Sequence, residues 1–406
     1  MSKPGLPVAV AVGLAAMMLD APTLAERQQQ TPPLPQEPGA QEPPASPQRP
    51  APAGLLPLTL IAEIDPGAAS ADGPNGKKAR PNAPALLYQG RLIFTTDSGE
   101  ARCFDADTGA SLWKLDLPGA PTLPPTSAPT GILLARGDGH LLLVDPERGE
   151  ILFDQTIDFP LTIPPLAQQD ILYLASPEGE VGAFHIGEKR LLWRTPTGEA
   201  VRALARGSGL VVASGDKGTL TALAAEDGQV RWTFRGQGGF EAGAVFDAEK
   251  EERLFIGDTS GVFYSLSADE GKERYRWKTG AAITVPALVQ NKRVYVASHA
   301  NLLFAYLERS GHEQWRADLP SRPATGPVAA GPFLALGTLN GEIVELNATS
   351  GKRGGTPYQT PADIRTPPTL APPRVAVVLR SGKVILLGHP APAPAPTETQ
   401  PVRSAR

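Results

Sequence analysis

A turn glycine followed by an aromatic residue recurs about every 40 residues along most of the chain. The aromatic residues lie 38 to 45 positions apart and include all five tryptophans. They are Trp113, Phe153, Trp193, Trp232, Trp277 and Trp315, and the glycines that precede them are Gly109, Gly149, Gly187, Gly228, Gly271 and Gly311, with Gly351 continuing the series without an aromatic residue. A repeat of this length with internal strands is typical of one blade of a β-propeller.

Each repeat also contains a short apolar run. Valine, isoleucine and leucine follow one another without alternation, which predicts a strand covered on both faces. The eight runs are Leu92–Thr95, Ile132–Ala135, Ile171–Ala175, Leu210–Ala213, Leu254–Gly257, Val294–Ala297, Phe333–Leu336 and Val375–Leu379. The sequence therefore predicts an all-β, eight-bladed β-propeller with about four strands in each blade.

The two ends of the repeat region predict how the ring closes. The last unit ends after Val384–Leu387 and has no outer strand. At the other end, Leu55–Ile64 has apolar residues at alternating positions (Leu58, Leu60, Ala62 and Ile64) and no partner hairpin. We expect this N-terminal strand to pair with the C-terminal hairpin, because that pairing hides two sheet edges.

The regions outside the repeats are rich in proline, alanine and glutamine and cannot bury enough apolar surface to fold. We expect a signal peptide over residues 1–25, because an apolar run over 6–19 precedes small residues. That run is short for a membrane span, although an uncleaved anchor is the alternative. A disordered Pro/Gln-rich linker is expected over 26–54, the propeller over 55–389 and a disordered Pro-rich tail over 390–406.

Charge and cysteine content exclude several classes of function. The net charge of -4 gives no electrostatic footprint for nucleic acid. The single cysteine, Cys103, rules out an intrachain disulfide and a cysteine-based zinc site. It also leaves no lipid attachment site at the N-terminus, so membrane association would require an uncleaved N-terminal segment. We expect a periplasmic or otherwise exported protein.

The clearest copy of the repeat, DADTGASLW over 105–113, has the appearance of a chemical site. As a calcium loop it fails, because Ala110 and Asp116 stand where an EF-hand needs glycine and glutamate. The alternative is structural. Asp105 would cap the turn through backbone N–H groups, and Trp113 would pack between neighbouring blades.

This copy resembles the pyrroloquinoline-quinone (PQQ) repeat family, whose motif is Ala-x-Asp-x-x-Thr-Gly-x-x-x-Trp. The chain matches at Asp105, Thr108, Gly109 and Trp113, with Cys103 in place of alanine. The resemblance implies the propeller fold. One branch of the family holds PQQ and calcium in dehydrogenases, many with a vicinal cysteine pair that this chain cannot form.

The chain is more similar to the other branch, the non-catalytic BamB family of the outer-membrane β-barrel assembly machinery. Members of that family normally carry a lipid on an N-terminal cysteine, which is missing here. The resemblance implies a non-catalytic, exported protein-binding scaffold without a cofactor, whose partner is a protein of the cell envelope. A PQQ-dependent dehydrogenase-like quinoprotein and a glycan-binding propeller are the alternatives.

One connection between blades stands out as a candidate partner-binding segment. Residues 231–240 place Phe234, Arg235 and Phe240 beside three glycines, and aromatic and arginine residues are common anchors of protein interfaces. The alternative is a glycine-loosened connection with its aromatic rings turned inward.

Overall fold

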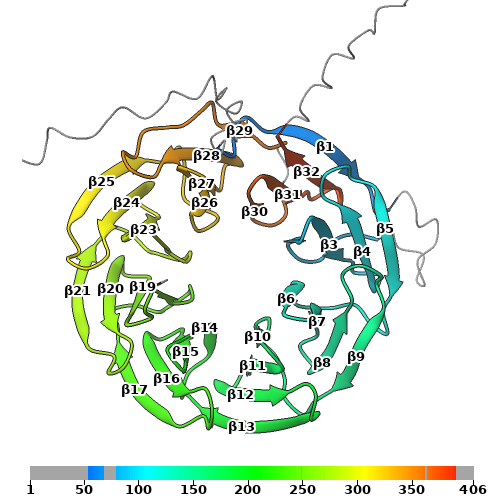
Figure 1. The fold of residues 1–406 in the computed structure, drawn as a ribbon, viewed down its shortest axis with the longest axis horizontal. Coiled ribbons are helices and arrows are strands. Elements are labelled where there is room, and N and C mark those ends of the chain that lie inside the picture. The colour runs from blue at the N-terminus through cyan, green and yellow to red at the C-terminus, as the bar shows by residue number, and fades with distance from the viewer. Residues whose placement is uncertain (1–53, 68–78, 248, 362–363, 390–406) are drawn as a thin grey trace, which may run out of the picture. The chain divides into compact units, whose positions relative to one another are not determined.

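A computed structural model describes residues 54–67, 79–247, 249–361 and 364–389. These residues form eight four-stranded antiparallel sheets arranged in a ring, which confirms the predicted eight-bladed propeller (Figure 1). The predicted signal peptide 1–25, the tail 390–406 and all of the predicted linker 26–54 except Gly54 lie outside the described residues.

Each blade follows the chain from an inner to an outer strand. Blades 1 to 4 contain β2 (Leu86–Tyr88), β3 (Arg91–Thr95), β4 (Glu100–Asp105) and β5 (Ser111–Asp116); β6 (Thr126–Ala128), β7 (Gly131–Ala135), β8 (His140–Val144) and β9 (Ile151–Thr156); β10 (Leu166–Gln168), β11 (Ile171–Ala175), β12 (Glu180–His185) and β13 (Arg190–Pro196); and β14 (Val201–Gly207), β15 (Leu210–Gly215), β16 (Thr219–Ala224) and β17 (Val230–Arg235).

Blades 5 to 7 repeat this order, and blade 8 takes its outer strand from the N-terminal end of the described chain. They contain β18 (Val245–Phe246), β19 (Arg253–Gly257), β20 (Val262–Ser267) and β21 (Glu273–Lys278); β22 (Leu288–Gln290), β23 (Arg293–Ser298), β24 (Leu302–Leu307) and β25 (Glu313–Asp318); β26 (Val328–Ala330), β27 (Phe333–Gly337), β28 (Glu342–Asn347) and β29 (Tyr358–Gln359); and β30 (Thr369–Ala371), β31 (Arg374–Val378), β32 (Val384–Gly388) and β1 (Thr59–Ile64).

The core lies between the blades and is built mainly from the second and third strands. The eight predicted apolar runs fall on the second strands, and β3, for example, buries every residue after Arg91. The fourth strands are half-exposed, as in β5, where alternate residues face solvent. This burial explains why the second strands read as continuous apolar runs and the outer strands do not.

The predicted closure of the ring is confirmed, with one difference in detail. Strand β1 pairs with β32 from Thr59 opposite Gly388 to Ile64 opposite Val384 (Figure 1). A bulge between Leu60 and Ala62 breaks the expected alternation, since a bulge adds one residue to one strand. Leu60 is therefore 57% exposed. The bulged Ile61 packs against the core cluster between blades 8 and 1 instead.

The two faces of the ring carry different turns. We call the face with the turns between third and fourth strands the motif face, because it holds the repeated glycine. These turns bond to the neighbouring first-to-second strand turns, as when the Ala106 N–H donates to the Gly90 carbonyl. The opposite face, the hairpin face, holds the second-to-third strand hairpins and the connections between blades. There the Leu117 N–H donates to the Gly99 carbonyl, and most blades repeat this bond.

Candidate functional site

The repeated aromatic residues dock onto the glycine turn of the next blade. A Cβ atom added to Gly149 would lie 2.7 Å from the Trp113 ring, so only glycine fits beneath the indole. The indole Nε1 of Trp113 donates to the Pro146 carbonyl of that turn at 3.0 Å. Matching bonds of 2.8 to 3.2 Å join Trp193 to Ala225, Trp232 to Ala268 and Trp315 to Ala348. The predicted packing of tryptophan between blades is confirmed.

Two members of the predicted series are wrong. In blade 3 the positive φ belongs to Lys189 (φ 54) rather than Gly187, since the turn is displaced by two residues. In blade 5 Tyr275, rather than Trp277, lies at the docking position opposite Ser265. The Tyr275 hydroxyl donates to the Glu308 carbonyl, which is the position that the indoles bond in other blades. Trp277 is a second ring on the same seam, bonded to the Gly311 carbonyl at 2.7 Å.

The DADTG turn is a structural cap, as the second interpretation predicts. One carboxylate oxygen of Asp105 accepts from the Asp107 N–H at 3.0 Å and from the Thr108 N–H and hydroxyl at 2.7 Å each. The hydrogen bond from the Thr108 hydroxyl is the main reason that the pKa of Asp105 lies below its usual value. Asp107 pairs instead with Arg374 of blade 8, at 2.6 Å. Both carboxylates are thus engaged by the protein itself.

Blade 7 lacks the small residue and the aromatic residue that lie opposite each other in other blades. The N-terminal segment fills their place. In blades 1, 3, 4 and 6 a small residue of the third strand lies opposite the aromatic residue, as Ala222 lies opposite Trp232. In blade 7 the corresponding positions hold Glu345 and Gly355. The Glu345 carboxylate is buried and accepts from the Leu55 N–H at 2.7 Å and the Leu56 N–H at 3.3 Å.

The two leucines occupy the seam between blades 7 and 8. Leu55, Leu56 and Leu58 are buried in one cluster with residues of both blades. A Cβ added to Gly355 would lie 3.4 Å from the Leu56 Cβ, so Leu56 covers the place of the missing aromatic residue. The sequence signal for this exchange is the appearance of glutamate where the repeat has a small residue, which we did not anticipate.

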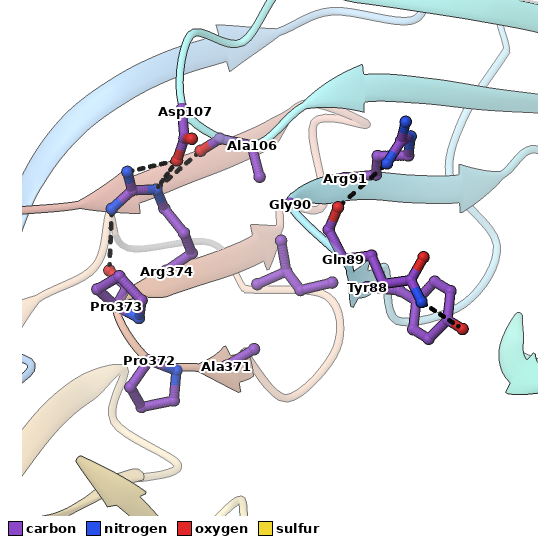
Figure 2. Close-up of a pocket in the computed structure, with 11 residues that line it drawn as sticks. Tyr88, Gln89, Gly90, Arg91, Ala106, Asp107, Ala371, Pro372, Pro373 and Arg374 are labelled. Carbon is purple, nitrogen blue, oxygen red and sulfur yellow. Dashed lines mark hydrogen bonds and ion pairs between the residues drawn. The ribbon is translucent and has the colours of Figure 1, made fainter. Parts of the chain in front are cut away.

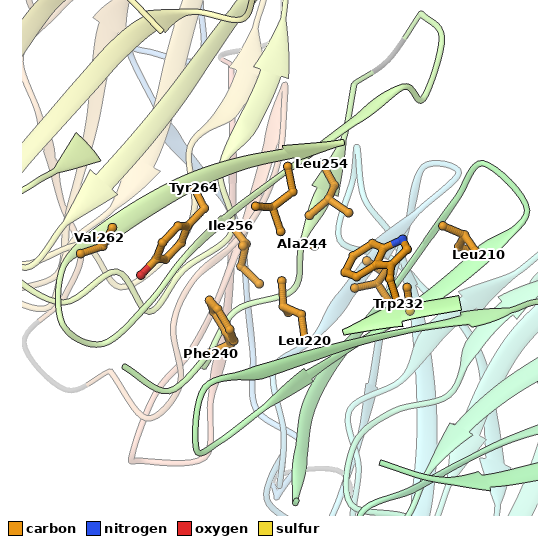
Figure 3. Packing of buried hydrophobic residues seen from close by; sticks show 13 residues of the cluster. Leu210, Leu220, Trp232, Phe240, Ala244, Leu254, Ile256, Val262 and Tyr264 are labelled. Atoms are coloured by element: carbon orange, nitrogen blue, oxygen red, sulfur yellow. The ribbon is translucent and has the colours of Figure 1, made fainter. Parts of the chain in front are cut away.

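The candidate partner-binding segment is partly interior. Phe240 is fully buried and packs edge-on against Tyr264, with ring centres 6.2 Å apart (Figure 3). Phe234 is half-buried against the same Tyr264 ring, at 5.1 Å. Phe240 therefore cannot meet a partner from this position, and the inward-turned alternative describes it correctly. The buried Asp258 holds the connection in place by accepting from the Gln237 and Gly238 N–H groups.

Arg235 is the exposed member of the predicted set. It ends β17 on the hairpin face, donates to the Thr219 hydroxyl at 2.7 Å and lies 3.6 Å from Glu199. The buried Glu199 also accepts the Lys217 and Thr219 N–H groups, because Gly215 offers the hairpin no side chain of its own. This arrangement fixes the Arg235 guanidinium at the surface. Partner binding by Arg235 stays a prediction.

The longer step in blade 5 comes from the connection between β18 and β19. This connection runs from the end of β18 at Phe246 to the start of β19 at Arg253, whereas residues 291 and 292 alone separate β22 from β23. The glycine-rich connection over 236–240 contributes none of the added length.

A hollow of about 290 Å³ lies on the motif face where blade 8 meets blade 1. Its walls come from the inner turns of both blades and include Tyr88, Arg91 and Pro372 (Figure 2). The Arg374 guanidinium spans the seam, donating to the Ala106 carbonyl at 2.9 Å and to Asp107. Sequence reasoning missed this hollow, because residues nearly 300 positions apart form it.

The described residues contain no group of three or more His, Cys, Asp or Glu side chains that could hold a metal ion. Burial raises the pKa of the Cys103 thiol to about 12, so the nucleophilic thiolate does not form at neutral pH.

In the part of the chain that the structure describes, no helix has the length and apolar character needed to cross a membrane.

Comparison with known proteins gives the family. A family model described as "Outer membrane protein assembly factor BamB" matches residues 77–158, 97–233 and 216–387, which together cover more than half of the chain. The chain belongs to the BamB family. The BamB-family protein of Yersinia pestis is 23% identical over 332 residues, covering 73% of this chain and 82% of that protein. The one from Shewanella oneidensis is 21% identical over 364 residues, covering 82% and 90%.

Solved structures agree with the BamB-family fold. The crystal structure of BamB from Moraxella catarrhalis superposes with a TM-score of 0.62 at 17% identity, covering 82% of this chain and all of that one. The computationally designed Ika8 protein gives a TM-score of 0.66 at 15% identity, covering 77% of this chain and 97% of that one. At these identities the likeness concerns the fold alone.

Proposed function

We propose that this protein is a non-catalytic scaffold that binds a protein partner during outer-membrane protein assembly in the cell envelope. The observation that carries the proposal is the family match across nearly the whole ring, from residue 77 to residue 387. The relatives named above are outer membrane protein assembly factors. A rigid closed ring suits such a role, because strands fix the positions of the connecting loops while the loops supply contacts.

The proposed contact point is Arg235 on the hairpin face. Its guanidinium is held by Thr219 and Glu199 and is nevertheless exposed. An arginine that is already ordered loses less conformational entropy when a partner binds. Phe234 supports it from beneath through its packing on Tyr264 rather than by direct contact.

The test is co-purification of the full chain with the central β-barrel protein of the assembly machinery from the same organism. We expect Arg235→Glu to reduce the recovered partner about tenfold without changing the melting temperature, because charge reversal repels a matched surface. Arg231→Glu is the matched control, since Arg231 is exposed on the same strand but near the motif face.

Three results would contradict this function. Failure of the wild-type protein to co-purify would remove the scaffold assignment. Oxidation of alcohols or sugars after addition of PQQ and calcium would instead favour the quinoprotein alternative, and retention on a glycan column would favour the glycan-binding one.

Export is part of the proposal. We propose that residues 1–25 direct the chain out of the cytoplasm, and that no lipid is attached near the N-terminus, since Cys103 is the single cysteine. Edman sequencing of the protein from a periplasmic fraction tests this. A mature N-terminus close to residue 26 is the expected result, and recovery of the protein in the cytoplasm would contradict it.

A further inference from the structure

A hollow of about 460 Å³ lies among the first strands of blades 2, 3 and 4, which face the centre of the ring (Figure 1). Most of the residues that line it are apolar. Ile163, Leu166 and Leu204 are half-buried there and pack on the core cluster between blades 3 and 4. The hollow is therefore an open continuation of that core toward the centre of the ring. Its volume falls within the range of small-molecule sites.

The hollow lies where a long first strand stands beside a short one. Strand β14 runs for seven residues, whereas β10 has three. Pro164 and Pro165 precede β10, and proline has no N–H to donate to a neighbouring strand. Strand β14 contains no proline, which allows it to begin at Val201. Residues 163–167 and 202–204 form two walls of the same hollow.

Arg202 supplies the charge in the wall of the hollow. It lies near the hairpin-face end of β14, and its side chain is 48% exposed. Its guanidinium lies 3.7 Å from Asp216 and 3.9 Å from Glu241, and both distances exceed the length of a hydrogen bond. The two carboxylates balance the charge of Arg202 without taking up its N–H donors. An anion that entered would meet both carboxylates, so an uncharged acceptor fits better.

We propose that this hollow binds a small, uncharged apolar molecule that carries one carbonyl group. The apolar walls cover the body of the molecule, and the Arg202 N–H groups donate to its carbonyl oxygen. The molecule then lies with its carbonyl group toward the hairpin face. The site is separate from Arg235, which lies on the outer strand β17, so the proposal does not depend on the function proposed above.

The probe is prodan, an uncharged naphthalene that carries one ketone, titrated with the full chain while its emission is recorded. Ala167→Phe and Ser127→Phe each place a ring in the hollow, and Ser127 is exposed, so its substitution leaves the core intact. The matched control is Ala329→Phe. Ala329 lies opposite Leu334 in blade 7 as Ala167 lies opposite Leu172 in blade 3. Melting temperatures show that each variant is folded.

We expect saturable binding of prodan, with emission shifted to shorter wavelength because the probe leaves water. Either filling variant should bind at least about tenfold more weakly, since the added ring takes the space of the probe, and the control should bind like the wild type. Arg202→Met keeps an apolar stem and removes the donors, so it should weaken prodan binding about tenfold. Phenylnaphthylamine, which has no carbonyl group, should bind this variant and the wild type equally.

Distinct outcomes would overturn each part of the proposal. Absence of saturable prodan binding, or unchanged binding by the folded filling variants, would show that the hollow is not a ligand site. An equal loss in Ala329→Phe would place the probe elsewhere in the ring. If Arg202→Met weakened both probes equally, the arginine would not donate to the carbonyl group. Stronger binding of anilinonaphthalene sulfonate than of prodan would assign the hollow to an anion.

Discussion

The seam between blades 4 and 5 and the seam between blades 7 and 8 perform the same task with different residues. At the first, Trp232 docks on Gly271 and its indole N–H bonds the Ala268 carbonyl at 2.8 Å. At the second, a glutamate and two leucines from the N-terminal segment replace the aromatic ring. The first contact joins residues about 40 positions apart, whereas the second joins residues 290 apart.

This difference shows where the ring depends on its two ends. A propeller assembled from local contacts alone would leave one seam open, because the last repeat has no next blade in sequence. Here the N-terminal segment contributes twice. Strand β1 completes blade 8, and Leu55 and Leu56 complete the neighbouring seam. Ring closure therefore rests on about ten residues that precede the repeats.

The largest effect is expected from Leu55→Ala/Leu56→Ala, which removes the leucine contacts at the seam between blades 7 and 8. Both side chains are buried, and truncating a buried leucine typically costs about 2–5 kcal/mol, so the pair should cost about 4 kcal/mol or more in free energy of unfolding. Urea denaturation measures the loss. The control is Leu60→Ala in the same segment, which should change stability by less than about 0.5 kcal/mol because Leu60 is exposed.

Trp232→Ala should cost about 3–5 kcal/mol at the aromatic seam, since it leaves a cavity and removes a bond to the next blade. Trp232→Phe keeps a ring over Gly271 but loses the indole N–H, so it should cost less. If both variants were as stable as the wild type, the indole would not hold the blades together. The same urea titration reports on both.

The pH dependence of Glu345 gives a smaller and more specific test. Burial raises the pKa of the Glu345 carboxyl above its usual value, although the Leu55 and Leu56 N–H groups and His389 act in the opposite direction. The folded protein then keeps this proton to a higher pH than the unfolded chain. The contribution to stability is complete below the unfolded pKa and is lost as the pH rises through the folded one.

We therefore expect the stability of the wild type relative to Glu345→Gln to increase as the pH falls from 7 to 5. Urea midpoints of both proteins at several pH values provide the measurement. Placing His389→Ala in both backgrounds removes the nearby imidazole, whose Nε2 lies 2.5 Å from the Gly54 carbonyl oxygen. A difference that stayed constant with pH would show that Glu345 does not titrate in this way.

The sequence was sufficient for the fold because the relevant signals are local. The apolar runs, the repeated turn glycines and the unpaired strand over 55–64 together predicted eight blades and their closure. Errors arose where a residue was judged by type rather than by position. Trp277 was placed in the series because it is a tryptophan, whereas Tyr275 is the residue that lies opposite Ser265. Leu60 was assigned to the interior because a bulge cannot be read from alternation.

The candidate site was less predictable because it depends on distant contacts. Phe240 is buried because Asp258, eighteen residues later, holds its connection against blade 5. The Glu345 contact and the hollow beside Arg374 both need residues from opposite ends of the chain. Only the replacement of a small residue by Glu345 is visible in the sequence. It can be interpreted only when the residues that lie opposite Glu345 are known.

Amide hydrogen exchange of the full chain tests most directly whether the N-terminal segment is part of the ring. If residues 55–64 complete blade 8 and the neighbouring seam, their amides should exchange as slowly as those of β32, and Leu55→Ala/Leu56→Ala should accelerate exchange in blades 7 and 8 together. Rapid exchange over 55–64 while β32 stays protected would contradict the account, because the ring would then be closed without them.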